Sequence, residues 1–540
     1  MNNYIIKLLI VALPFMMIGC SISQSKKNSN YRVVVTDEST VAQTIYGAIQ
    51  GYRDGDVFTF KGIPYAQAER FMPPTAPEKH NDTLKCRLYG PKAPQMESLE
   101  WKGINQTDYA FGNQFVYEPM DEKGCLVLNV WTKGLNDGKK RPVFVWIHGG
   151  GYFAGSGHDL PCYEGWALAE KGDIVTLTLN HRLNILGYSD LTALGGKYEN
   201  SVNLGMQDIV MALKWVHDNI TNFGGDPNNV TIGGQSGGGG KVSTLLAMPS
   251  AHGLFHKAII QSGSTLTQTE PEQSRALGLA MLEELGVNAK NADKLLDSFT
   301  YEQLLDASNK AVQKLAKAGD GGRRMMGGSP VVDGNILPTH PFSPAAPEIS
   351  KDIPVIIGTD FNEFSFENTP LTMEEATKLL KERYGEKTDD YIAAFKKMYP
   401  EKTPREMVAI DLGFRKGAIR QAELKSRQKG APIYHYLFTW QPTTNVLAAS
   451  HGMELPFMFN NVALQPEMTG NTAEAHALEN IMSNAWIQFI KTGDPNHEGM
   501  PKWEPFTEEN PVYMIFDNEC KMKTVDADTK ALMEFGKPIF

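Results

Sequence analysis

The chain has 540 residues, of which 41% are hydrophobic and 21% are charged, and its formal net charge is −10. This composition is that of an ordinary globular protein with a large buried core, and it excludes an intrinsically disordered chain. The acidic balance argues against a nucleic-acid partner, because such binding needs a concentrated basic face that displaces counterions.

The first 30 residues have the pattern of a targeting segment. Lys7 precedes an apolar stretch, residues 8–18, that is too short to span a bilayer but has the length of a signal-peptide core. The run from Met17 to Cys20 resembles a bacterial lipobox, in which the cysteine is lipidated, although Met17 stands where leucine is usual. We expect a lipoprotein signal at residues 1–20, a tether at 21–30, and export to the periplasm or cell envelope with a lipid at Cys20. Plain secretion is the alternative.

Four other cysteines are spread widely along the chain. They form no CxxC pair and have no histidine at metal-ligand spacing, so we expect no zinc site. Cys86 with Cys125 is a candidate disulfide, and free buried thiols are the alternative.

The strands and helices predicted from the pattern alternate. Near the start, β-rich runs at residues 32–35 and 57–60 indicate an antiparallel ribbon at a sheet edge. Residues 205–219 have apolar positions at helical spacing. Short apolar runs typical of strands buried on both faces occupy residues 126–131, 143–147, 174–178, 230–232, 257–260 and 354–357. Such alternation indicates an α/β fold with a large, mostly parallel central sheet flanked by helices.

Two long stretches, residues 271–315 and 372–424, have helical periodicity and no strand pattern. We expect them to be helical insertions that wall a substrate gorge. The chain has no internal repeat and no long low-complexity linker, so we expect residues 31–540 to form a single domain.

The sharpest local motif is G-x-S-x-G, formed by Gly234, Ser236 and Gly238 directly after a predicted strand. The chain must turn sharply there from strand to helix, and glycines relieve the crowding while the serine stays exposed at the tip. The motif therefore predicts that Ser236 is a nucleophile.

The glycine run 237–240 ends at Lys241, which invites comparison with a phosphate-binding loop. That motif needs glycine at position 235 and serine or threonine at 242, whereas this chain has Gln235 and Val242. Four glycines in a row are costly in a helix. We interpret them as a sign of close backbone packing beside the nucleophile.

A second glycine loop follows the predicted strand at residues 143–147. Acyl transfer needs backbone N–H groups aimed at the developing oxyanion, and glycines allow that backbone to approach the substrate. Gly150, Gly151 and Gly237 are therefore the candidate oxyanion-hole donors.

A serine nucleophile needs a base, and the base needs a carboxylate that fixes its tautomer. His451 lies on a loop after a predicted strand, whereas His435 lies within a strand and His256 in a helical stretch, so we expect the last two to be structural. Both Asp360 and Glu363 follow a predicted strand, and their spacing alone leaves the acid open between them.

These motifs resemble those of the type-B carboxylesterase family, which includes cholinesterases, mammalian carboxylesterases and bacterial nitrobenzyl esterases. Further matching runs cover nearly the whole mature chain, at residues 60–66, 125–131, 203–208, 222–227, 261–263 and 492–496. The resemblance implies an α/β-hydrolase fold and a serine carboxylesterase that works through an acyl-enzyme and needs no cofactor. It also implies a triad of Ser236, Glu363 and His451, and so favours Glu363 over Asp360.

The chain departs from the family in the residues beside the nucleophile, in its disulfides and in a short segment after Tyr65. Gln235 and Gly237 stand where the family usually carries glutamate and alanine, and the usual disulfide partner of Cys125 falls near Ala93. Two other functions stay open: a non-catalytic binding or adhesion protein on this scaffold, and a hydrolase of an activated amide or lactone. The expected partner is a small-molecule ester.

Overall fold

A computed structural model describes residues 33–35, 38–96, 119–317, 328–366, 368–443 and 447–536. The predicted signal peptide, the tether and Cys20 lie outside these ranges. Within them, none of the helices has both the length and the apolar character that crossing a membrane requires.

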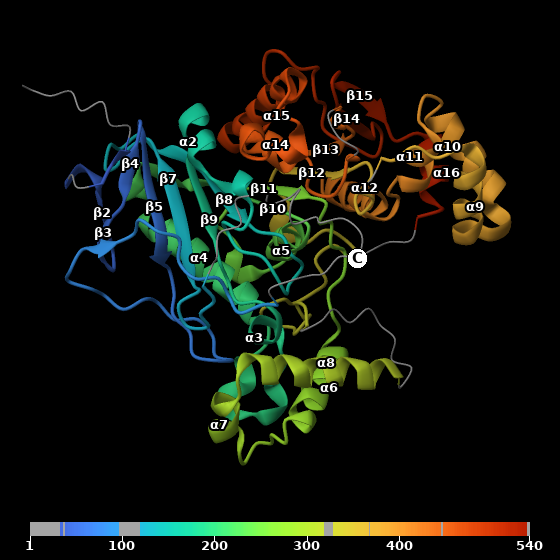
Figure 1. Ribbon diagram of the computed structural model, residues 1–540. Coiled ribbons are helices and arrows are strands. Elements are labelled where there is room, and N and C mark those ends of the chain that lie inside the picture. The colour runs from blue at the N-terminus through green and yellow to red at the C-terminus, as the bar shows by residue number, and fades with distance from the viewer. Residues whose placement is uncertain are drawn as a thin grey trace, which may run out of the picture.

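One large sheet runs through the molecule (Figure 1). Seven neighbouring strands, β9, β8, β10, β11, β12, β13 and β14 in spatial order, pair in parallel. The strands beyond them on either side pair antiparallel. In spatial order the twelve strands are β1 (Val33–Val34), β4 (Tyr52–Asp54), β5 (Val57–Pro64), β7 (Val127–Thr132), β9 (Val175–Leu179), β8 (Arg141–Ile147), β10 (Gly225–Gln235), β11 (Lys257–Gln261), β12 (Val355–Asp360), β13 (Ile433–Phe438), β14 (Val512–Phe516) and β15 (Lys521–Thr524). The predicted mostly parallel sheet is confirmed.

A small second sheet contains β2 (Val41–Thr44), β3 (Gly47–Gln50) and β6 (Leu84–Lys85). Most of the predicted strands match observed ones to within a residue or two. The main difference is β10, which begins five residues before the predicted run at 230–232, because its first residue already pairs with Arg141 of β8.

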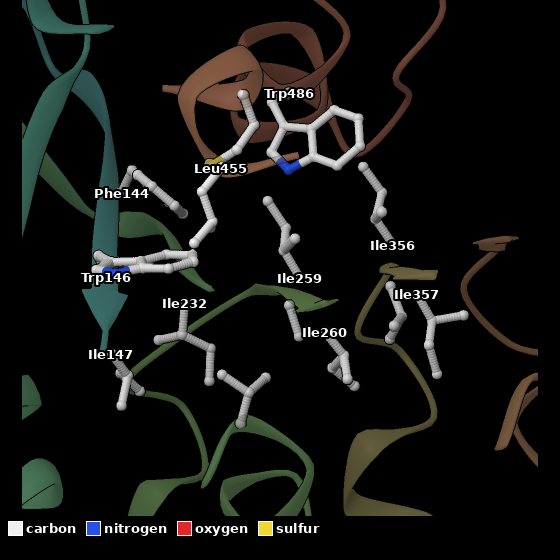
Figure 2. Close-up of a cluster of buried hydrophobic side chains, with 14 of the residues drawn as sticks. Phe144, Trp146, Ile147, Ile232, Ile259, Ile260, Ile356, Ile357, Leu455 and Trp486 are labelled. Atoms are coloured by element: carbon white, nitrogen blue, oxygen red, sulfur yellow. The ribbon is translucent and has the colours of Figure 1, made fainter. Parts of the chain in front are cut away.

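The central strands are buried on both faces, as continuous apolar runs predict. Figure 2 shows Trp146 and Ile259 of the sheet close to Leu455 and Trp486 of the covering helices. Burying one such side chain stabilises the fold by about 1.5–3 kcal/mol. This packing holds the strand ends, and hence the loops that follow them, in place.

Helices cover the sheet and extend beyond it at two places (Figure 1). Their bounds are α2 (Trp166–Gly172), α3 (Asn184–Tyr188), α4 (Leu204–Asn219), α5 (Gly237–Leu245), α6 (Pro271–Glu284), α7 (Ala292–Leu295), α8 (Tyr301–Lys317), α9 (Met373–Tyr384), α10 (Thr388–Met398), α11 (Pro404–Ala409), α12 (Gly413–Ser426), α13 (Leu455–Met458), α14 (Pro466–Thr469), α15 (Ala473–Thr492) and α16 (Ala527–Met533).

Both predicted helical stretches are helical. Helices α6, α7 and α8 form a block below the sheet in Figure 1, with their own core that includes Met281 and Leu304. In the second stretch α9 and α10 pack on each other, whereas α12 packs directly on β12 and β13. Helix α12 is therefore part of the layer that flanks the sheet rather than of an insertion. The gorge stays a prediction.

One local prediction is wrong, and one pair of open alternatives is resolved. His256 lies outside any helix, because its N–H donates to Val230 O at 2.7 Å and its Nδ1 accepts from Val230 N at 3.2 Å, which extends the pairing of β10 with β11. Cys86 and Cys125 are both buried and free, so the candidate disulfide is absent. His435 lies in β13 as expected.

Candidate active site

The carboxyl ends of five neighbouring parallel strands meet at one edge of the sheet, which is where open parallel sheets place their sites. The loop or turn after each strand carries a polar or glycine-rich element. These are Gly149–Gly151 after β8, Ser236 after β10, Ser262 after β11, Glu363 after β12 and His451 after β13.

Ser236 lies at a strained turn between β10 and α5. Its φ of 58° and ψ of −127° are a conformation that a residue with a side chain rarely adopts. A Cβ on Gly234 would lie 2.5 Å from the carbonyl carbon of Gly238, and one on Gly238 would lie 2.1 Å from Ile147 O. Only glycine fits at positions 234 and 238, two residues before and two residues after the serine, which is the physical reason for the G-x-S-x-G spacing.

His451 and Glu363 are joined twice. The imidazole Nδ1 donates to Glu363 Oε2, and the main-chain N–H of His451 donates to Glu363 O at 2.8 Å. Glu363 is fully buried, while the His451 side chain is 13% exposed. With Nδ1 as donor, Nε2 can accept a proton, and among the described residues it has no hydrogen-bond partner. The structure thus brings together the predicted base and acid.

The other oxygen of Glu363 is held by two donors. Glu363 Oε1 accepts from Ser262 Oγ at 2.7 Å and from Asp360 N at 2.9 Å. The sequence alone indicates no role for Ser262, although this residue lies in the 261–263 run that is part of the family resemblance. Ser262 positions the carboxylate that orients His451.

Asp360 points elsewhere. Its Oδ2 accepts from Gly452 N at 2.9 Å, and burial, followed by the charges of Glu454 and Glu363, raises the pKa of Asp360 well above its usual value. Burial also raises the pKa of Glu454, whose Oε1 accepts from Gln261 Nε2 at 3.0 Å. The geometry therefore assigns Glu363, and not Asp360, to His451.

A third carboxyl group near Glu363 also resists ionisation. Burial, and next the charge of Glu363, raises the pKa of Asp411 to about 7. Asp411 Oδ2 accepts from the N–H groups of Phe414 and Arg415 at the start of α12. Below about pH 7 its neutral form spares Glu363 a neighbouring negative charge.

The three predicted oxyanion donors lie close together. Gly150 and Gly151 adopt φ values of 81° and 63°, and a Cβ on Gly237 would lie 2.2 Å from Gly151 O. The loop therefore packs directly on the first residue of α5. Within the described ranges, the N–H groups of these glycines have no main-chain acceptor outside the regular helices and strands, so they can donate to a ligand.

Aromatic rings stand beside the imidazole. The Phe364 ring stacks on His451 with centroids 4.5 Å apart, and Phe414 lies 5.5 Å from the same imidazole. Phe364 is 46% exposed, which is unusual for so large an apolar side chain. In the part of the chain that the structure describes, no group of three or more His, Cys, Asp or Glu residues could hold a metal ion.

Comparison with known proteins shows the family of this chain. The model of the carboxylesterase family matches residues 38–532. The chain belongs to the carboxylesterase family. This carboxylesterase is 34% identical to the para-nitrobenzyl esterase of Bacillus subtilis, a match that covers 89% of the chain and 96% of the relative. Phenmedipham hydrolase of Pseudarthrobacter oxydans is 31% identical, with 89% and 95% covered.

A solved structure extends the comparison to the fold. An esterase from anaerobic Clostridium hathewayi, described as able to hydrolyse aliphatic aromatic polyesters, superposes with a TM-score of 0.83 at 36% identity, covering 93% of this chain and 98% of that one. The fold is that of the α/β-hydrolases, and the protein is a serine carboxylic ester hydrolase.

We expect Glu363→Gln to lower kcat by about 10⁴-fold, because an amide in place of the carboxylate no longer fixes the imidazole tautomer. Asp360→Asn is the matched control: its Oδ1 can still accept from Gly452 N, so kcat should stay within a few-fold of wild type. Steady-state kinetics on a p-nitrophenyl ester measure both. An Asp360 variant that loses more activity than the Glu363 variant would contradict the assignment.

Proposed function

We propose that this carboxylesterase acts through Ser236, His451 and Glu363. His451 Nε2 takes the hydroxyl proton while Ser236 Oγ bonds to the ester carbonyl carbon, and the carbonyl π pair moves to the oxygen. The N–H groups of Gly150, Gly151 and Gly237 stabilise that oxyanion. The C–O bond to the alcohol then breaks, and His451 returns the proton to the leaving alkoxide.

The second half of the cycle restores the enzyme. His451 takes a proton from water, whose oxygen bonds to the acyl carbon, and the carboxylic acid leaves as Ser236 Oγ regains a proton. Glu363 holds the imidazole throughout and stabilises the imidazolium that forms in each half.

One observation carries this proposal: the imidazole bonded to a buried carboxylate has an Nε2 without a hydrogen-bond partner among the described residues, and it lies at the same sheet edge as the strained serine turn. A binding protein on this scaffold needs neither the strain at Ser236 nor the Glu363–His451 pair. An activated amide or lactone would meet the same nucleophile, and its hydrolysis is an outcome of the substrate test.

We expect hydrolysis of p-nitrophenyl esters from acetyl to decanoyl, with kcat at least about 10⁴-fold lower in Ser236→Ala. An organophosphate should add the mass of one phosphoryl group to each molecule of the wild type and leave the mass of the variant unchanged. Ester turnover retained by Ser236→Ala would overturn the nucleophile assignment. A wild type that cleaves only lactones or activated amides would redirect the substrate class.

The substrate class follows from the aromatic rings beside His451. We infer that the preferred esters carry an aromatic ring near the scissile bond, because the exposed face of Phe364 offers stacking next to the base. A relative named para-nitrobenzyl esterase, and a similar esterase described as able to hydrolyse aliphatic aromatic polyesters, are consistent with such a preference.

We expect Phe364→Leu, which keeps an apolar side chain, to lower kcat/KM for benzyl acetate roughly 2- to 10-fold, the range that one aromatic contact provides. Ethyl acetate on the same variant is the control and should change less than 2-fold. An equal loss on both esters would mean that Phe364 only supports the position of His451.

We also propose that the protein is a lipoprotein of the cell envelope, on the strength of the apolar stretch 8–18 and the Met17–Cys20 run. Expression with an alkyne fatty acid should label the wild type and leave Cys20→Ser unlabelled. Cys520→Ser is the control and should keep the label. Release of unlabelled wild type into the medium would instead indicate plain secretion.

A further inference from the structure

Lys241 is a fully buried lysine five residues after Ser236, on α5. An ammonium group loses its hydration on burial and is retained only where hydrogen bonds replace it. Burial lowers the pKa of Lys241 to about 7, against the opposing effect of the Asp159 charge. A fully buried lysine side chain this close to the nucleophile needs a physical explanation.

We call residues 148–152, which follow β8 and include Gly150 and Gly151, the oxyanion loop. Among the described residues, both hydrogen-bond acceptors of Lys241 belong to this loop. Nζ donates to Gly151 O at 2.8 Å and to His148 O at 3.2 Å. The ammonium also lies 5.6 Å from the ring centroid of Tyr152, the next residue of that loop. The side chain thus spans from the nucleophile helix to the loop on the neighbouring strand β8.

The two carbonyls between these acceptors have donors of their own. Gly149 O accepts from His148 Nδ1 at 2.9 Å, and Gly150 O accepts from Phe153 N at 3.3 Å and Ala154 N at 3.0 Å. Because a peptide unit is planar, the direction of each carbonyl sets the direction of the following N–H. All four carbonyls from 148 to 151 are held. Local donors hold those of 149 and 150, which set the directions of the Gly150 and Gly151 N–H groups, and Lys241 holds the flanking carbonyls of 148 and 151, which fixes the two ends of the loop.

Gly237 provides the space for this arrangement. A Cβ at 237 would lie 2.2 Å from Gly151 O and 2.4 Å from Gly151 Cα, both of them backbone atoms that cannot move aside without moving the loop. The family usually carries alanine at this position. Two features therefore concern Gly151 O. Because residue 237 has no Cβ, this oxygen can approach the start of α5, and Lys241 binds it there.

We infer that Lys241 is a positioning residue that clamps the oxyanion loop onto α5, and that the clamp depends on glycine at 237. Lys241 touches no reacting atom. It acts by holding the two ends of the loop that carries the Gly150 and Gly151 N–H groups, so the inference rests on the proposed function of this site. Its effect should therefore appear in transition-state stabilisation and not in the binding of an intact substrate.

The test compares Lys241→Met, which keeps the length of the side chain but has no donor, with Lys241→Gln, which keeps a donor without the charge. Lys425→Met is the matched control. Lys425 lies on α12, is also buried, and donates from Nζ to the carbonyls of Ser350 and Lys351 at 2.7 and 2.8 Å. Each variant is measured per active site, titrated with an organophosphate.

The main readout is binding of a trifluoromethyl ketone beside its non-fluorinated methyl ketone. Ser236 Oγ adds to the activated carbonyl, its proton passes to His451, and the resulting oxyanion occupies the hole. Lys241→Met should weaken the fluoroketone and lower kcat/KM by the same factor, about 10- to 100-fold. The methyl ketone Ki should stay within 2-fold. Lys241→Gln should recover part of the loss, and Lys425→Met should match wild type.

A double-mutant cycle tests the dependence on Gly237. Gly237→Ala should lower kcat/KM strongly in the wild-type background and much less in Lys241→Met, where the loop is free to retreat from the new methyl group. Additive losses would overturn the pairing of the two residues, and an equal weakening of both ketones by Lys241→Met would overturn the clamp. If Ser236→Ala binds the fluoroketone as tightly as wild type does, the proposed nucleophile itself is wrong.

Discussion

The parallel pairing of five strands is the constraint on which the site depends. Gly234 in β10 pairs with Ile147 of β8 and with Ile260 of β11, and Ile260 pairs with Ile357 of β12. A slip of one residue would turn a whole strand's side chains to the opposite face. Because both faces of these strands are buried, the apolar packing penalises any such slip. The hydrophobic core thereby fixes the positions of groups that lie far apart in the sequence.

Much of the fold could be predicted because buried parallel strands have a continuous apolar pattern, and Ser236 because a strained turn needs glycines. The acid could not be chosen from spacing. The backbone of Glu363 adopts a φ of 38°, and its side chain binds a histidine 88 residues further on. The side chain of Asp360 instead accepts a hydrogen bond from Gly452 N. Lys241 was visible only as the end of a glycine run, since a sequence does not show which loop a side chain reaches.

Burial shapes the electrostatics around Glu363. Asp360, Glu454 and Asp411 all have pKa values raised above their usual range, so each of these carboxyl groups ionises less readily than an exposed one does. Gln235 fits this arrangement. Its Nε2 lies beside Gly452, whose N–H binds Asp360, and a glutamate at 235 would bring another negative charge to that point. The departure from the family therefore reduces charge crowding behind the nucleophile.

The glycine run that opens α5 also limits how this enzyme can diversify. A side chain at 237, 238 or 239 would meet backbone atoms at 2.9 Å or less, so those positions offer no route to a new pocket shape. New specificities must arise from residues at the margin, such as Phe364, or from the helical segments outside the sheet. The backbone around the nucleophile leaves little room for new side chains unless it moves, and the evolvability of the protein lies in its periphery.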